Sequence, residues 1–290
     1  MEPASTPVSY THLQKGLLAL PSIGMSPGWT SLCAQYMMDR MDEVHDVVIR
    51  WGDYVDTDAF FAPISPAVLV REWFGSSPVC TLCGKQADVD LLESGEEFSF
   101  PMPIGTQTVY TVTSHPDIVL IPRFAGKPIR RCEEKGGVFH RNRSMEQIWL
   151  EMIRRAAKEP MDGNTLDALA STLIPPLSYA QLLEQGCIRD HAVCFSCEVT
   201  GIRQQRPVRH ICYYTSTLEQ ARRHLPWASP AVYGTVGGMP VELVLMLGRG
   251  ELSQTGVRCV AELDVIERLN RAMANRGQIL TERIEQPMEA

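Results

Sequence analysis

LPSIGMSPGWTSLCAQYMMDRMDEVHDVVIRWG, residues 20–52, places a loop, a helix and an apolar strand in direct succession. Gly24 and Gly28 let the backbone turn sharply, and the fixed φ of Pro27 suits the first turn of a helix. Ser26 can cap that helix, whose free first-turn amides attract a carboxylate or a phosphate. An ordinary capped helix start has the same signature. The stretch therefore predicts a loop–helix–strand unit and leaves open whether the loop binds a ligand.

The composition of the chain excludes some classes of partner. Its 290 residues, 44% of them hydrophobic, can form one large domain or two modest ones. The net charge of -7 gives no support to a nucleic-acid partner, which calls for a basic surface. No uninterrupted apolar run reaches membrane-spanning length, and the first residues lack the layout of a secretory signal. We expect a cytoplasmic protein with no nucleic-acid partner and no membrane partner.

The nine cysteines, in a chain without an export signal, indicate reduced thiols. Cys80/Cys83 and Cys194/Cys197 have the C-x-x-C spacing that a four-thiolate zinc site uses. The second pair lies in a stretch typical of an extended strand, where residues three apart face opposite sides of the sheet. Neither pair opens a clear helix, which disfavours a redox role. We therefore predict no metal site.

The middle of the chain reads mainly as short strands. SPAVLVREWFG, residues 65–75, first predicts a helix with a Ser cap, an early Pro and a Gly stop. Beyond it, turn residues such as SGEE, PMPIG and SHPD separate extended segments. We expect strands within residues 78–92, 106–114, 117–124 and 136–140.

The second half of the chain alternates helices with one hairpin. An amphipathic pattern predicts a helix over Ser144–Lys158, with Ile148, Leu150, Met152 and Ile153 on its apolar side, and shorter helices follow in residues 164–173 and 178–186. Residues 190–217 predict a β-hairpin that turns near Gly201–Pro207, and long helices are expected over Ala231–Gly248 and Val260–Asn275. The element order predicts an α+β fold, a mixed, largely antiparallel sheet backed by helices.

Two further stretches offer residues with chemical potential. His115, Asp117 and Arg123 surround a turn, where the histidine can donate to a substrate carboxylate and the arginine can clamp one. Each is equally typical of a surface turn or a structural ion pair. Gly237 and Gly238 precede Pro240 in an apolar run, which indicates either a loop-to-helix turn or close backbone approach to a ligand, or tight packing against a neighbouring strand.

Three motifs, taken in order, resemble the saccharopine dehydrogenase-like family of NAD(P)-dependent reductases. Gly24–Gly28 followed by Asp42-Glu43-Val44 is similar to the family's G-x-D-P-G loop and D-E-V-x-x-V strand. Residues 100–124, with FPMPIG, YTVTSHPD and LIPRF, resemble its F-P-x-P-x-G, H-P-E and L-P segments, and residues 233–257 resemble its T-G-x-P helix and the following G-V. Ser26, Asp117 and Gly237 stand where the family usually has Asp, Glu and Thr.

The resemblance implies a function. The family transfers hydride between NAD(P) and the C–N bond of an imine or secondary amine that joins amino-acid-like units, as in lysine metabolism. It implies that Gly24, Ser26, Pro27 and Gly28 lie against the nicotinamide, and that His115, Arg123, Gly237 and Gly238 line the substrate cleft. It names no general acid and implies a possible homodimer. Saccharopine, a carboxylated polyamine and other opine-like amines all remain open as small-molecule substrates.

The start of the chain departs from the family. Members begin with a Rossmann domain that carries a glycine-rich phosphate turn, whereas this sequence has no G-x-G-x-x-G. VSYTHL, residues 8–13, also resembles a translated transposon adapter from sequencing libraries. We therefore expect residues 1–15 to be a non-native or disordered leader and residues 16–290 to be the family's C-terminal substrate and dimerisation domain, inactive alone. The alternative is a non-enzymatic binding or assembly module derived from the same domain.

Overall fold

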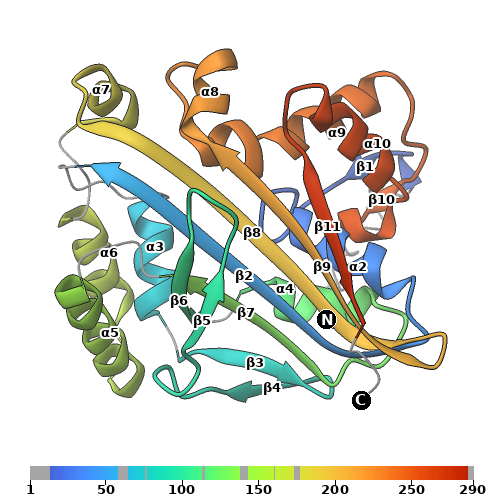
Figure 1. The fold of residues 1–290 in the computed structure, drawn as a ribbon, viewed down its shortest axis with the longest axis horizontal. Helices are drawn as coiled ribbons and strands as arrows, with labels where there is room; N and C mark the ends of the chain where they lie inside the picture. The colour runs from blue at the N-terminus through green and yellow to red at the C-terminus, as the bar shows by residue number, and fades with distance from the viewer. Residues whose placement is uncertain are drawn as a thin grey trace, which may run out of the picture.

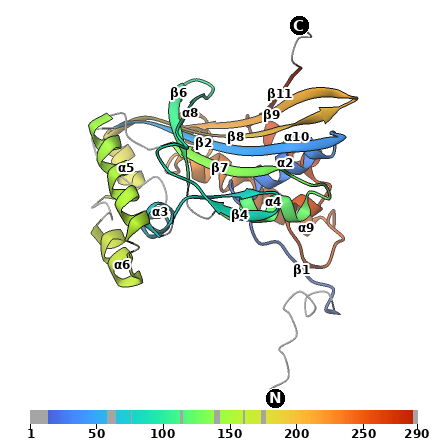
Figure 2. The same ribbon diagram turned by 90° about the horizontal axis from the view of Figure 1, so that it is seen from below.

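The computed structural model has an open, strongly twisted sheet with helices packed mainly against one face (Figures 1 and 2). It describes residues 14–57, 65–75, 77–112, 115–137, 143–159, 161–172 and 177–286. The sheet order is β11-β9-β8-β2-β7-β3-β4, and β6 pairs with both β5 and β7. The strands are β2 (Glu43–Thr57), β3 (Val79–Leu82), β4 (Lys85–Asp88), β5 (Glu96–Ser99), β6 (Thr106–Thr111), β7 (Arg131–Gly137), β8 (Ile188–Arg203), β9 (Arg206–Thr217) and β11 (Leu280–Glu285). This arrangement confirms the predicted α+β class and the largely antiparallel sheet.

Strand β2 is central because it joins both halves of the sheet. It runs antiparallel to β8 and parallel to β7, so the sheet is mixed at this one strand. The predicted hairpin is formed by β8 and β9, and Gln204 and Gln205 close it with positive φ angles of 53° and 64°. A two-residue turn of that hand matches the twist of paired strands. A separate short pair, β1 (Leu18–Ala19) with β10 (Gly256–Val257), is parallel.

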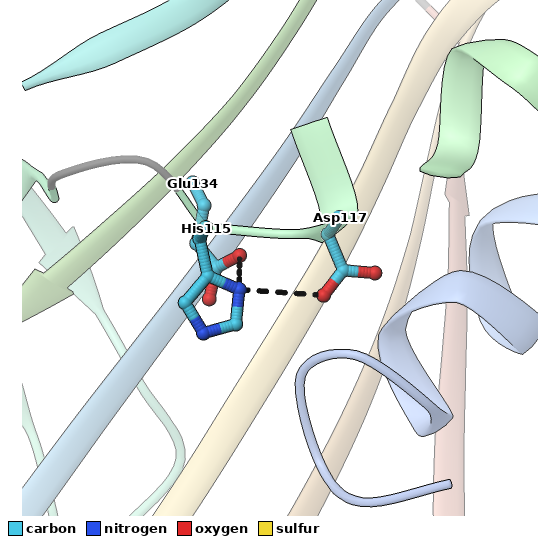
Figure 3. A group of neighbouring side chains, drawn as sticks. All are labelled: His115, Asp117 and Glu134. Atoms are coloured by element: carbon cyan, nitrogen blue, oxygen red, sulfur yellow. Dashed lines mark ion pairs between the residues drawn. The ribbon is translucent and has the colours of Figure 1, made fainter. Parts of the chain in front are cut away.

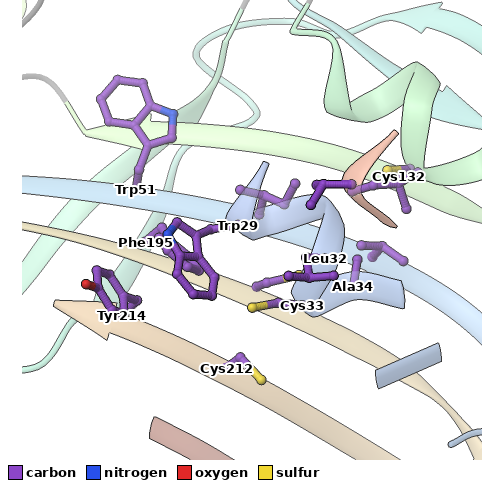
Figure 4. Packing of buried hydrophobic residues seen from close by; sticks show 14 of the residues in the cluster. Trp29, Leu32, Cys33, Ala34, Trp51, Cys132, Phe195, Cys212 and Tyr214 are labelled. Carbon is purple, nitrogen blue, oxygen red and sulfur yellow. The ribbon is translucent and has the colours of Figure 1, made fainter. Parts of the chain in front are cut away.

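The opening helix, α2 (Trp29–Met38), is buried under the sheet, as its apolar sequence suggests. Trp29 stacks on Tyr214 of β9 with ring centroids 5.4 Å apart, and Tyr214 stacks in turn on Phe195 of β8 (Figure 4). These rings belong to the main hydrophobic core between the sheet and its helices. Residues 20–52 therefore form the expected loop, helix and strand, because the burial of Trp29 fixes α2 against the long strands.

The cysteine pairs do not converge on one ion. Cys197 packs in the main core, whereas Cys194 belongs to a second cluster on the other face, beneath the β5–β6 hairpin. Cys80 is buried in β3, and Cys83 is exposed in the turn that follows. The alternation of β8 thus separates Cys194 from Cys197, as the sequence predicts, whereas the turn after β3 carries Cys83 away from Cys80.

Most predicted helices are present. They are α3 (Pro66–Phe74), α5 (Arg143–Lys158), α6 (Gly163–Thr172) and α7 (Tyr179–Glu184). Leu150 and Ile153 of α5 are buried and Met152 packs on the core, while the side chain of Ile148 lies outside the described part of the chain. The structure adds α8 (Leu218–His224), which the sequence reading missed although Thr217 and Gln220 form a capping box.

Two predictions for the strand-rich middle of the chain are wrong. Residues 117–124 form a helix, α4 (Asp117–Phe124), because Ile118 and Ile121, three residues apart, are both buried while Val119 is exposed. Glu96 and Glu97, expected in a turn, instead begin β5. The predicted strand at residues 136–140 covers only the end of β7, and residues 138–140 lie outside the described part of the chain.

The two long C-terminal helices are interrupted. Ala231–Thr235 is a π-helical turn, η1, and the α-helix α9 (Gly238–Gly248) follows it. Val260–Glu262 is a 3₁₀ turn, η2, separated from α10 (Ile266–Ala274). Ala231–Gly248 together has the length and composition of a membrane span, with a mean hydropathy of 1.4, but half of it is buried inside the domain. A core helix explains that apolarity equally well, and the run is weak grounds for a membrane partner.

Candidate functional site

A cavity of about 330 Å³ lies where the opening loop meets the middle of the sheet. Seven separate regions of the chain contribute to it. Its lining residues are Ser22, Gly24, Met25, Ser26, Pro27, Trp51, Asp53, Val68, Glu72, His115, Glu134, Val193, Ala231, Thr235 and Val236. The set includes three carboxylates and one histidine but no lysine or arginine, so among the described residues the cavity is lined by acid groups and apolar surface.

The loop before α2 forms one wall of the cavity. Gly24 donates its N–H to the carbonyl of Pro27 at 2.9 Å, which closes the loop. Gly28 follows with a φ of 145°, and a Cβ there would lie 2.1 Å from the Gly24 carbonyl oxygen. Only glycine fits at this position. Gly28 therefore shapes the loop from behind, while Gly24, Ser26 and Pro27 face the cavity.

Two expectations for this loop are wrong. Ser26 does not cap α2, whose N-cap residue is Gly28. The amides of Trp29 and Thr30 donate to the carbonyls of Gly24 and Met25, so neither amide is free to bind an anion. Because these two amides are already hydrogen-bonded within the loop, they cannot serve as donors to a bound anion.

Asp117 anchors the loop to the start of α4. Its side chain is fully buried, and its Oδ2 accepts hydrogen bonds from the hydroxyls of Ser26 at 2.5 Å and Thr30 at 3.1 Å. Its Oδ1 accepts from the hydroxyl of Ser31. Ser26 in the loop thus donates its hydroxyl hydrogen to Asp117, the first residue of α4. This network holds α4 against α2, and with it the position of His115.

His115 lies among three carboxylates at the edge of the cavity. Figure 3 shows two of them, Asp117 and Glu134. Its Nδ1 is 2.7 Å from Oε2 of Glu134 and 3.7 Å from Oδ2 of Asp117, and its Nε2 is 3.9 Å from Oε1 of Glu72. Burial disfavours the charged imidazole, but attraction to Glu134 and Asp117 outweighs it and raises the pKa of His115 to about 11. The histidine is therefore a cation at neutral pH.

Glu134 is the least satisfied member of this group. Its side chain, on β7, is fully buried, and neither oxygen has a hydrogen bond of good geometry although Oε2 lies close to His115. Burial is the largest cause that raises the pKa of Glu134, and burial likewise raises the pKa of Glu72. A carboxylate in this state binds a cation or a proton strongly because it has little other compensation.

The same residues approach the geometry of a metal site. His115, Asp117 and Glu134 place one ligand atom each within 4.8 Å of one another. Both oxygens of Asp117, however, already accept hydroxyl hydrogen bonds. Asp117 is therefore a poor metal ligand, and the protonated His115 has no free lone pair. Glu134 is then the one available donor of the three, where a metal site needs at least three.

An aromatic wall stands beside the carboxylates. Trp51 of β2 lines the cavity and meets Trp73 of α3 edge to face, with centroids 6.2 Å apart. Gly136 of β7 lies against the indole, and a Cβ there would come within 2.0 Å of it. Tryptophan is the best aromatic partner for a cation. The cavity therefore combines carboxylates with an indole face, a combination suited to an organic cation.

The structure brings together only part of the predicted site. Gly24, Ser26, Pro27 and His115 meet at the cavity, although up to 91 residues separate them. Arg123 is exposed at the far end of α4, with its guanidinium 5.8 Å from the ring centroid of Phe124, and does not line the cavity. Its predicted role as a carboxylate clamp there has no geometric support.

Gly237 and Gly238 lie just behind the cavity wall. Thr235 and Val236 line it in their place. A Cβ on Gly238 would lie 2.3 Å from Cε of Met273 in α10, so this glycine permits close packing between helices. The glycine pair is thus closely packed, but against a helix and not against a strand as the tight-packing interpretation expected.

Trp51, Asp53, Glu72 and Glu134 were not predicted from the sequence. The signal available for Glu134 was a charged run, CEEKGG, inside an otherwise buried strand, since Glu133, Glu134 and Lys135 are all buried. No comparable signal marks Glu72, which lies on an ordinary amphipathic helix.

Comparison with known proteins adds no assignment: no protein-family model matches the chain, and no curated protein matches it significantly. The functional conclusion therefore depends on the residues of the cavity itself.

Proposed function

We propose that this chain supplies the substrate-binding and catalytic portion of an NAD(P)-dependent oxidoreductase that acts on the C–N bond of an imine or secondary amine. The observation that carries the proposal is the meeting of the Gly24–Pro27 loop with His115 and Glu134 at one cavity. The motif resemblance expected the loop and the histidine to share a site. The carboxylates add the charge that a cationic nitrogen requires.

The chemistry of an iminium ion suits this lining. When bound, the nicotinamide supplies or accepts a hydride at the carbon next to nitrogen. The protein has to hold the positively charged nitrogen and provide or remove one proton. Glu134 and Glu72 lie close enough to the cavity to stabilise that charge, and Trp51 offers its ring face. The protonated His115 next to Glu134 favours the charged form of that carboxylate, which the nitrogen then meets.

The cofactor fits this chain only in part. The closed Gly24–Pro27 loop presents backbone and a proline ring to the cavity, a surface against which a flat ring can pack. The sequence has no glycine-rich phosphate turn to hold the rest of the nucleotide. A nucleotide-binding domain from elsewhere would have to hold the phosphates.

The lining also discriminates among substrates. Saccharopine carries carboxylates on both sides of its secondary amine, and these need basic partners. No lysine or arginine occurs among the described residues that line the cavity. We therefore favour a polyamine-type substrate with few carboxylates.

Isothermal titration of the purified chain with spermidine and with saccharopine tests the charge preference. We expect spermidine to bind at least tenfold more tightly, because both amines would enter an acidic cavity. The reverse preference would contradict the assignment of the substrate class.

Hydride transfer can be tested without a nucleotide-binding domain. N-benzyl-1,4-dihydronicotinamide lacks phosphates, and 1-pyrroline is a small cyclic imine. We expect the chain to accelerate loss of the dihydronicotinamide absorbance in the presence of 1-pyrroline. Tight amine binding without any acceleration would instead favour the non-enzymatic binding module.

A further inference from the structure

A second histidine, His191, links the cavity to the short helix α7. His191 lies on β8, and its Nε2 is 3.2 Å from Oδ2 of Asp53 on β2. Its Nδ1 is 2.8 Å from the hydroxyl of Tyr179 in α7. Asp53 lines the cavity, so three hydrogen-bonded side chains run from the cavity to a short helix outside it.

His191, in the middle of this chain of residues, is its most buried member. The side chain of His191 is 1% exposed and that of Asp53 is 6% exposed, whereas Tyr179 is half-buried. The charges of Arg222 and Asp190 act on the Tyr179 hydroxyl, and both residues line a separate surface hollow. The inner end therefore faces the cavity and the outer end approaches solvent.

The direction of the hydrogen bonds follows from the carboxylate and the tyrosine together. The carboxylate of Asp53 can only accept, so Nε2 of His191 is the protonated nitrogen that donates to it. Burial, reinforced by the charge of Asp53, raises the pKa of Tyr179, so its hydroxyl keeps its proton at neutral pH and donates to Nδ1 of the neutral imidazole. At rest, every proton in the chain is placed to move toward the cavity.

We propose that Tyr179 and His191 form a proton relay that delivers a proton through Asp53 to a substrate nitrogen while the cavity is occupied. The proposal rests on the proposed function, because reduction of an imine consumes one proton for each hydride. Water gives a proton to the Tyr179 oxygen, the hydroxyl proton passes to Nδ1, the Nε2 proton passes to Asp53, and Asp53 protonates the nitrogen.

This sequence of shifts balances in charge and in protons. One proton enters at Tyr179 and one leaves at Asp53, and the imidazole changes from its Nε2–H to its Nδ1–H form. After the product leaves, water in the open cavity returns a proton to Nε2 through Asp53, and the reverse shifts restore the resting form. His191 and Tyr179 act through Asp53 and are positioning residues.

The test uses Tyr179→Phe, which removes the outer hydroxyl and keeps the ring. Histidine labelled with ¹⁵N gives ring signals, and His191→Gln identifies those of His191. With spermidine bound, we expect exchange of the Nε2 proton with water to be at least tenfold slower in Tyr179→Phe than in the wild type. Tyr233→Phe, which loses a hydroxyl bond to the Arg276 carbonyl, is the matched control and should exchange as the wild type does. Equal exchange in Tyr179→Phe and the wild type would overturn the relay.

A second reading separates the relay from the proposed function. Without any amine, the ring shifts should report the Nε2–H form of His191 in the wild type and a mixture in Tyr179→Phe. If titration shows that spermidine does not bind while these tautomers are found, the substrate proposal fails and the hydrogen-bonded chain stands. If spermidine binds but His191 has the Nδ1–H form at rest, the relay fails and the substrate proposal stands.

Discussion

Two histidine–carboxylate pairs meet the cavity, Asp53 with His191 behind it and Glu134 with His115, and they differ in how completely they are satisfied. His191 has a partner at each ring nitrogen, Tyr179 on one side and Asp53 on the other. His115 lies among three carboxylates, and Glu134 next to it has no well-aligned hydrogen bond. A satisfied pair holds its geometry, whereas an unsatisfied one retains attraction for a further charge. The two pairs therefore suit different tasks, supply at His191 and reaction at His115.

The largest expected effect is that of removing Asp117, which holds the loop and the start of α4 next to His115 and Glu134. Asp117→Ala should lower the free energy of unfolding by about 3–5 kcal/mol, because three hydroxyl bonds to a buried carboxylate are lost together. Urea unfolding at neutral pH measures this. Asp46→Ala, which removes a pair with the exposed Arg130, should cost less than about 1 kcal/mol. Equal costs would mean that Asp117 does not organise the site.

Glu134→Gln should separate reaction from fold. We expect the reduction of 1-pyrroline by the dihydronicotinamide to fall about 100-fold, since an amide neither stabilises an iminium charge nor sustains the protonation of His115. Glu133 is the matched control because it is equally buried, precedes Glu134 on β7 and faces the other side, where Thr111 and Arg131 bind it. Glu133→Gln should change the melting temperature and have little effect on the rate of 1-pyrroline reduction. A similar loss of rate in both variants would contradict a specific role for Glu134.

The pH dependence of stability should distinguish the His115 pair. The pKa of His115 rises from an unfolded value near 6.5 to about 11, so its contribution is fully present below pH 6.5 and is lost as the pH rises toward 11. The linkage slope in that window approaches about 1.4 kcal/mol per pH unit for one proton. Between pH 7 and pH 9, the wild type should therefore lose more unfolding free energy than His115→Gln. Parallel pH profiles would show that His115 is neutral in the folded chain.

The sequence predicted the helices and strands around the site better than the charged residues that line it. The opening unit, the β8–β9 hairpin and most helices follow from local patterns, because burial imposes a period on each element. Residues 117–124 failed because a run of Ile, Val and Leu before a proline resembles a strand as much as a helix. The run CEEKGG marks Glu134 as unusual, but neither it nor Glu72 could be placed at the site from the sequence, since a helix and a distant strand must pack before they meet at His115. Long-range pairing of this kind leaves no local spacing to read.

The smallest effect is expected at Arg123, and it tests the choice of substrate. The sequence offers this residue as a carboxylate clamp, but its guanidinium is exposed over Phe124 and away from the cavity. Arg123→Ala should leave spermidine affinity within twofold and unfolding free energy within about 0.5 kcal/mol, as for an ordinary surface substitution. Saccharopine binding should be equally insensitive. If the variant instead weakened saccharopine tenfold and spared spermidine, Arg123 would reach the ligand, and a carboxylate-bearing substrate would replace the polyamine.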